Sequence, residues 1–156
     1  MSYNISSDSF QDPLLKPILE SLSNYFLSID VGFYVIGATA RDLVLSYHGE
    51  KPGRATRDLD IAIAISNWEE FEAIKEGIVN INDFRKDVNQ KQRFIFRDNY
   101  ELDIVPFGDI MKEGDKVFWP PDEQVAISVL GFKEVGEAAE KYKIDEGVEI
   151  DVASLV

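Results

Sequence analysis

The stretch Arg57-Asp58-Leu59-Asp60-Ile61-Ala62-Ile63-Ala64-Ile65 decides the fold of this chain. Its aliphatic residues alternate with acidic or small ones, which predicts a strand with one buried face. Because a strand reverses its side chains at every residue, Asp58 and Asp60 leave one face about 6.6–6.8 Å apart. The two alanines that follow on that face leave room for a ligand. A lone Asp-x-Asp is usually a solvated strand edge, but a cation between the carboxylates would offset their repulsion.

The segment upstream of this strand predicts a helix, a strand, a glycine turn and a second helix. Leucines and other apolar residues recur at helical spacing from Pro13 to Ile29, with Asp12 as the expected N-cap. A short apolar run, Phe33–Ile36, reads as a buried strand that ends at Gly37. The pattern from Thr39 to Tyr47 is again helical.

The segment downstream predicts a helix followed by a β-hairpin. Ser66 and Glu69 fit a capping box for a helix of about 67–77. Arg93–Phe96 and Leu102–Val105 alternate as two strands around a turn, and Asp103 lies in the second of them. Beyond residue 107 we expect a loop with a rigid Trp119-Pro120-Pro121 segment, a helix over 132–142 and an edge strand over 148–152.

The length of 156 residues suits one domain, with a core of about 13–107 and a shortened C-terminal extension over 108–156. No signal peptide or apolar span of about 20 residues is visible, so we expect a cytoplasmic protein. The chain has no cysteine and a single histidine, His48, in a turn-rich stretch. Thiolate zinc sites are thereby excluded, and any metal would be an oxygen-liganded one such as Mg²⁺ or Mn²⁺.

The net charge of −13 comes from 16 basic and 29 acidic residues. Such a surface repels nucleic acid overall. The basic residues are unevenly spread, because five of them lie between Arg85 and Arg97. This strip could meet a phosphate or could serve only solubility and ion pairing.

The order of these elements and motifs resembles the nucleotidyltransferase superfamily, which includes DNA polymerase β, the CCA-adding enzymes and the aminoglycoside nucleotidyltransferases. Within it the chain is most similar to AbiEii-type toxin nucleotidyltransferases, with a glycine motif closer to the CCA-adding form. The matching residues are the Gly37-Ala38-Thr39 turn, the Asp58-x-Asp60 strand and the later Asp103, over about half of the chain, 33–107.

This resemblance implies an α+β fold, a mixed β-sheet with helices packed mainly on one face. It implies that Asp58, Asp60 and Asp103 bind two Mg²⁺ or Mn²⁺ ions and catalyse transfer of a nucleotidyl group from an NTP to a hydroxyl. The nucleotide-binding residues would be Gly37, Ala38, Thr39, Arg41, Arg54 and Arg57. The glycine lets the backbone approach the triphosphate, and the helix after it favours anions at its N-terminus.

Two features depart from the family pattern. Ala38 replaces the second glycine or serine and supplies no hydroxyl. The region after Tyr142 is short, so the chain could be a shortened relative, a core that needs a partner, or a decayed copy.

Three functions therefore stay open: an active nucleotidyltransferase, an inactive NTP- and metal-binding regulatory or partner-binding module of the same fold, and a structural protein. For the enzyme, the acceptor could be an RNA or tRNA end, a small molecule or a protein. A toxin would also have an antitoxin as a partner. No membrane partner is expected.

Overall fold

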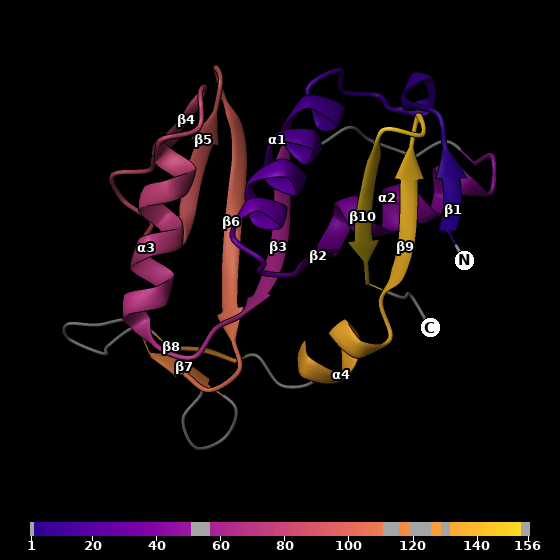
Figure 1. Ribbon diagram of the computed structural model, residues 1–156. Helices are drawn as coiled ribbons and strands as arrows, with labels where there is room; N and C mark the ends of the chain where they lie inside the picture. Colours follow the sequence, from indigo (N-terminus) through magenta and orange to yellow (C-terminus); the bar gives the residue numbers. More distant parts are fainter. Residues whose placement is uncertain (1, 51–56, 111–115, 119–125, 129–131, 154–156) are drawn as a thin grey trace.

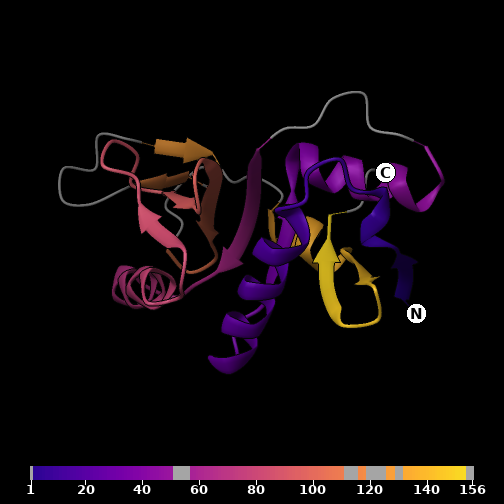
Figure 2. The same cartoon turned by 90° about the horizontal axis from the view of Figure 1, so that it is seen from above.

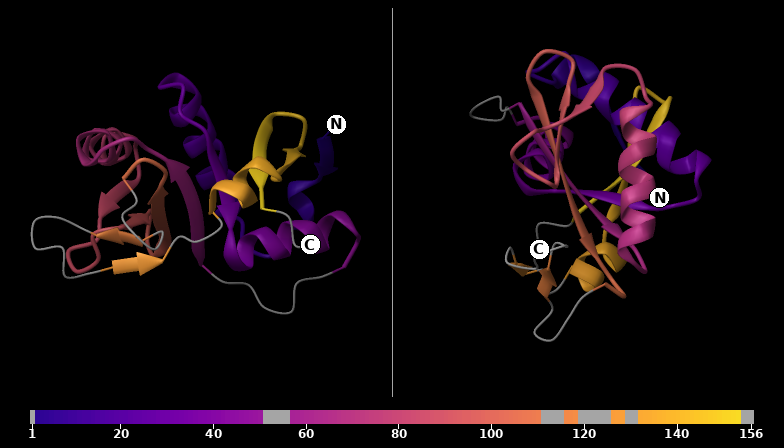
Figure 3. Two further views of the ribbon diagram at one scale, coloured as in Figure 1. Left: turned by 90° about the horizontal axis from the view of Figure 1, so that it is seen from below. Right: turned by 90° about the vertical axis from the view of Figure 1, so that its left-hand side faces the viewer.

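An eight-stranded mixed sheet organises the fold, in the order β1-β9-β10-β2-β3-β6-β5-β4 (Figure 1). The computed structural model describes residues 2–50, 57–110, 116–118, 126–128 and 132–153. The strands of this sheet are β1 (Ser2–Ile5), β2 (Phe33–Ile36), β3 (Asp58–Ala64), β4 (Phe84–Lys86), β5 (Arg93–Phe96), β6 (Tyr100–Phe107), β9 (Glu140–Ile144) and β10 (Val148–Val152). Two further strands, β7 (Lys116–Phe118) and β8 (Ala126–Ser128), pair separately from it (Figure 3).

Four α-helices accompany the sheet in the described part of the chain: α1 (Leu15–Ser28), α2 (Gly37–Tyr47), α3 (Trp68–Val79) and α4 (Phe132–Glu137). The first three confirm the helices predicted from apolar spacing, and β2 and β3 confirm the predicted strands. None of the helices in this part of the chain is long and apolar enough to cross a membrane. The α+β fold class expected from the sequence is therefore observed.

The central pair of strands, β3 and β6, is parallel. Between them in sequence run α3 and the β4–β5 pair, which together return the chain to the same end of the sheet. On its other side β3 pairs antiparallel with β2, which leads directly into α2. Three strands that are distant in sequence, β2, β3 and β6, are therefore neighbours in the sheet.

The two faces of the sheet differ in character. On one face α1 and α3 lie side by side and cover apolar strand residues (Figure 2). Tyr25 of α1 donates a hydrogen bond to the Ile74 carbonyl of α3, at 3.2 Å. Residues that are essentially inaccessible in this core are Ile18, Leu19, Leu22, Phe26, Val35, Leu59, Ile61, Ile63, Phe71, Phe94, Leu102 and Ile104. The opposite face carries Asp60 and is partly covered by α4.

Helix α4 contacts the acidic face through two aromatic residues. Tyr34 of β2 donates a hydrogen bond to the Phe132 carbonyl, and the Phe107 ring of β6 packs edge-on against the Phe132 ring. Gly136 permits this contact, because a Cβ there would lie 2.7 Å from the Tyr34 ring. Helix α4 therefore bounds the acidic face at the end where β2 begins.

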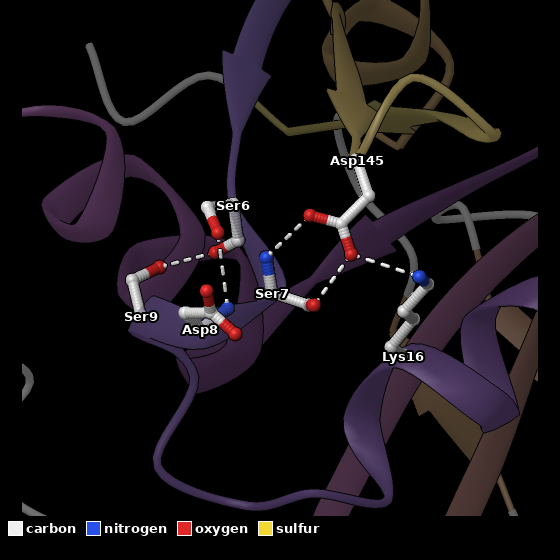
Figure 4. Close-up of polar contacts among 6 residues, drawn as sticks. All are labelled: Ser6, Ser7, Asp8, Ser9, Lys16 and Asp145. Atoms are coloured by element: carbon white, nitrogen blue, oxygen red, sulfur yellow. Dashed lines mark hydrogen bonds and ion pairs between the residues drawn. The ribbon is translucent and has the colours of Figure 1, made fainter.

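Asp145, in the turn between β9 and β10, ties the N-terminal segment to the sheet (Figure 4). Its carboxylate accepts hydrogen bonds from the Lys16 ammonium at 2.8 Å and from the Ser7 amide at 2.9 Å, besides one from the Ser7 hydroxyl. Lys16, and then Ser7, lower the pKa of Asp145 to about 2. This contact joins the end of β1, the start of α1 and the strand pair that flanks β2.

The helix starts differ from the predicted caps. Helix α1 has Leu14 as its N-cap, and Asp12 accepts a hydrogen bond from the Leu14 amide instead. For α3 the predicted capping box is wrong by one residue, since Asn67 accepts from the Glu70 amide and Glu70 accepts from the Ser66 amide. The Ile65 amide is still paired with the Phe107 carbonyl, so the chain stays extended too long for a cap at Ser66.

The C-terminal region departs further from the sequence prediction. The helix expected over 132–142 ends at Glu137, and 140–144 forms β9, because Tyr142 and Ile144 alternate into the core between β1 and β10. The strand 148–152 is present, but it lies between β9 and β2 and is no edge. The Trp119-Pro120-Pro121 segment lies outside the described residues.

Candidate active site

Four carboxylates lie in two neighbouring rows on the acidic face. The parallel register places Asp60 beside Asp103 and Asp58 beside Glu101. Adjacent strands are about 4.8 Å apart, so the paired carboxylates are closer than two residues along one strand. The structure thus brings together the three acids singled out in the sequence and adds Glu101.

Asp60 is half-buried on this face. Burial raises its pKa to about 6, repulsion from Asp103 and then Asp58 adds to the rise, and Arg93 opposes it. The charged form of a carboxylate that is disfavoured by burial and by neighbouring acids is strongly stabilised when a cation binds beside it.

Gly37 packs its backbone against the Asp60 carboxylate. Its φ is +71°, and a Cβ at this position would lie 2.9 Å from Asp60 Oδ2. A side chain would therefore be strained and would also displace the carboxylate. Gly37, which was predicted to let the backbone approach a triphosphate, is therefore also needed to leave room for the Asp60 carboxylate.

The first turn of α2 follows Gly37 and lies at the open end of β3. Its N-cap, Ile36, provides no side-chain hydrogen bond to the amides of this turn. Ala38 lies at the half-buried start of the helix. Thr39 is buried and its hydroxyl donates to the Asp58 carbonyl at 3.1 Å, which fixes the helix start to β3.

Arg93 of β5 binds Asp103 through both carboxylate oxygens. Nε lies 2.8 Å from Oδ1 and Nη2 lies 3.1 Å from Oδ2, while Nη1 is 3.5 Å from a Glu101 oxygen. The hydrogen bond to Asp103 raises the pKa of the Arg93 guanidinium. A charged fork of this kind is the strongest form of ion pair that side chains make.

The other predicted cationic residues are directed elsewhere. Arg41 is largely exposed and its Nε lies 3.7 Å from Asp42 Oδ1. Arg57 donates from Nε to Asp12 at 2.7 Å and from Nη1 to Asn99. Arg54 lies outside the described residues. Arg93, which was not among the predicted nucleotide-binding residues, is the arginine that is hydrogen-bonded to Asp103.

A cavity of about 510 Å³ opens on the same face, beyond Asp60 along β3. Its lining includes Tyr34, Ala62, Ala64 and Phe107 from the sheet and Lys133, Gly136 and Glu137 from α4. Ala62 follows Asp60 by two residues, a step of about 6.7 Å along a strand. The room predicted beside the two alanines is therefore present next to the acids.

The acids fit a hard divalent cation in their chemistry, since carboxylate oxygens are the ligands that Mg²⁺ and Mn²⁺ prefer. Asp60 also has the raised pKa that a cation would relieve. Yet within the described ranges no group of three acidic or imidazole side chains is arranged to hold an ion. Both oxygens of Asp103 are engaged by Arg93 instead.

Sequence reasoning missed Arg93 and Glu101 as parts of this site. The predicted hairpin has a five-residue connection, whereas the observed one has three residues, 97–99, with Arg97 at a φ of 54°. This change shifts the register by two residues and sets Arg93 opposite Asp103. The sequence does indicate that Arg93 and Glu101 share a face of the hairpin with Asp103, because each of them alternates with buried apolar residues of its strand.

Among solved structures, this chain is similar over most of its length to the lincosamide antibiotic adenylyltransferase LnuA with lincomycin bound. The identity is 16% and the TM-score 0.50, with 93% of this chain and 81% of that chain covered. The CCA-adding enzyme of Thermotoga maritima complexed with tRNA matches at 21% identity and a TM-score of 0.41, covering 62% of this chain. The antibiotic-resistance factor ANT(2'')-Ia matches at 18% and 0.42, covering 70% of this chain.

The chain spans 22% of the length of the CCA-adding enzyme and 58% of that of ANT(2'')-Ia. No family model matches the sequence, and no curated protein matches it either. The likeness to the lincosamide adenylyltransferase shows that this chain has the fold of a nucleotidyltransferase.

Proposed function

We propose that this protein is a metal-dependent nucleotidyltransferase that moves an NMP group from an NTP to a hydroxyl acceptor. The observation that carries the proposal is the register of β3 and β6, which sets Asp60 beside Asp103 with Asp58 on the same face. The close approach of Gly37 to Asp60 supports it, because it places the start of α2 against the Asp60 carboxylate.

In this proposal Asp58, Asp60 and Asp103 hold two Mg²⁺ or Mn²⁺ ions. When bound, these ions neutralise the triphosphate and activate the attacking hydroxyl. The acceptor oxygen bonds to the α-phosphorus while the bond from that phosphorus to the pyrophosphate oxygen breaks. The hydroxyl proton passes to the Asp103 carboxylate. The amides of Gly37, Ala38 and Thr39 donate hydrogen bonds to phosphate oxygens. Arg41, Arg54 and Arg57 remain the candidates that offset the charge on the leaving pyrophosphate.

For the acceptor we favour a small hydroxylated molecule bound in the cavity beside Ala64. Four acidic residues line this cavity, Asp30, Glu70, Glu137 and Asp151, and Lys133 is the one basic residue among the described residues of its lining. An acidic lining and a net charge of −13 repel the backbone of a nucleic acid. A toxin that acts on a tRNA end, held in check by an antitoxin in the cytoplasm, is the competing assignment.

The test is pyrophosphate release from each NTP in the presence of Mg²⁺ or Mn²⁺, with hydroxylated small molecules, tRNA and proteins as acceptors. We expect Asp58→Asn and Asp60→Asn each to abolish transfer, because each removes a metal ligand. Asp98→Asn removes the same charge from the exposed hairpin turn and should retain activity. Transfer that survives in both site variants would refute the proposal.

The alternative is a module of the same fold that binds NTP and metal without turnover. The departure at Ala38 motivates it, since the residue offers no hydroxyl to a phosphate. Tight metal-dependent NTP binding without pyrophosphate release for any acceptor would favour this module. Detection of a nucleotidylated acceptor would exclude it.

A further inference from the structure

The carboxylate of Asp103 already has a cationic partner in this fold. The Arg93 guanidinium meets it with two N–H groups, and the two side chains are 27% and 21% exposed. The pair is formed between directly opposed residues of β5 and β6, so the hairpin register holds it in place. By contrast, Arg93 acts on Asp60 through a charge interaction without a hydrogen bond, and this interaction lowers the Asp60 pKa only in part.

This arrangement restricts what Asp103 can do for a metal ion. A carboxylate has about four lone-pair positions, and a forked guanidinium uses one on each oxygen from the β5 side. Asp60 lies on the other side of Asp103, across β6 from β5. An ion bound by both Asp103 and Asp60 must therefore either displace the Asp103 carboxylate from Arg93 or lie close to the positive charge of the Arg93 guanidinium.

We propose that Arg93 competes with the divalent cation for Asp103 and so sets the metal affinity of the site. The inference rests on the proposed function, because it assigns a regulator to the same carboxylates. Arg93 offsets part of the negative charge of the acidic cluster until a cation replaces it. The opposite role, in which Arg93 orients Asp103 as a ligand, would make Arg93 a support for metal binding.

The two roles predict effects of opposite sign on binding of Mn²⁺ alone. If Arg93 competes, Arg93→Gln strengthens binding by roughly tenfold to a hundredfold, the range of a hydrogen-bonded charge interaction. If it supports the ligand, the same substitution weakens binding by roughly tenfold to a hundredfold. Arg93→Lys keeps the charge without the fork and should lie between wild type and Arg93→Gln.

The experiment measures Mn²⁺ affinity by electron paramagnetic resonance and by calorimetry, with no nucleotide present. Arg97→Gln is the matched control, because Arg97 pairs with Asp83 at the hairpin turn and loses the same unit of charge. Asp103→Asn is combined with Arg93→Gln to test the route of the effect. In the Asp103→Asn background, Arg93→Gln should change Mn²⁺ affinity by no more than Arg97→Gln does.

Each result distinguishes this inference from the proposed function. Unchanged or weaker Mn²⁺ binding in Arg93→Gln, with binding still lost in Asp60→Asn, overturns the role of Arg93 and leaves the metal site standing. Absence of Mn²⁺ binding in wild type and Arg93→Gln alike overturns both. Tighter binding in Arg93→Gln alone, dependent on Asp103, is the expected result.

Discussion

Replacing Asp60 by asparagine is expected to stabilise the metal-free protein at pH 8 by about 2–3 kcal/mol. The pKa of Asp60 is raised from 3.8 to about 6, first by burial and then by repulsion from Asp103 and Asp58. The folded state therefore holds the Asp60 proton more tightly than the unfolded state does. The contribution of Asp60 to the free energy of unfolding therefore falls as pH rises from about 4 to about 6, and asparagine avoids this loss.

Urea unfolding and thermal unfolding in the presence of a chelator, each at pH 4 and pH 8, measure this effect. The variant should gain little at pH 4 and its full advantage at pH 8, where its melting temperature should rise by roughly 4–12 °C. Asp98→Asn changes the net charge equally on an exposed turn and should gain nothing comparable. An Asp60→Asn protein that is no more stable than wild type at pH 8 would contradict the electrostatic account of the site.

The second large effect is expected from Gly37→Ala. A non-glycine residue at a φ of +71° costs about 1–2 kcal/mol. The added Cβ would also lie 2.9 Å from Asp60 Oδ2 and would force the carboxylate to move. We expect the substitution to lower the free energy of unfolding by about 2–3 kcal/mol and to weaken metal binding at Asp60.

Gly49→Ala provides the control for this prediction. Gly49 follows the end of α2 with a φ of +76°, and a Cβ there would meet nothing within 4 Å. The Glu50 amide bonds the Leu45 carbonyl at 2.9 Å, as in a helix end closed by glycine. Gly49→Ala should therefore lose only about 1–2 kcal/mol and keep its metal affinity. Equal losses of metal affinity in both variants would show that the contact of Gly37 with Asp60 does not matter.

The strand that carries Asp58 and Asp60 was predictable because its alternation is strict and one face is wholly aliphatic. The glycine turn at Gly37 was also predictable, because it directly follows the apolar run that forms β2, and β2 pairs with β3. Three strands were not predicted: β1 and β4, of four and three residues, and β9, which is rich in lysine and glutamate. Their strand conformation comes from pairing with distant segments, which local sequence does not contain.

The Arg93–Asp103 pair could not be predicted because hairpin register depends on the length of the turn. A connection shorter by two residues exchanges every cross-strand partner while leaving both faces unchanged. The cavity beside Ala64 was foreseen as open space, but its far wall is α4, whose position depends on the Tyr34 and Phe132 contact. These features require the assembled sheet.

The most direct test of the proposed site is a thermal-shift titration of the wild type and of Asp58→Asn/Asp60→Asn. Each NTP is added with and without Mg²⁺ or Mn²⁺, and each protein is compared with its own ligand-free melting temperature. A nucleotide at a hundredfold its dissociation constant should stabilise the wild type by about 2.7 kcal/mol, only with metal, and leave the double variant unchanged. No rise with any nucleotide, or an equal rise in the double variant, would contradict a metal-dependent nucleotide site at these carboxylates.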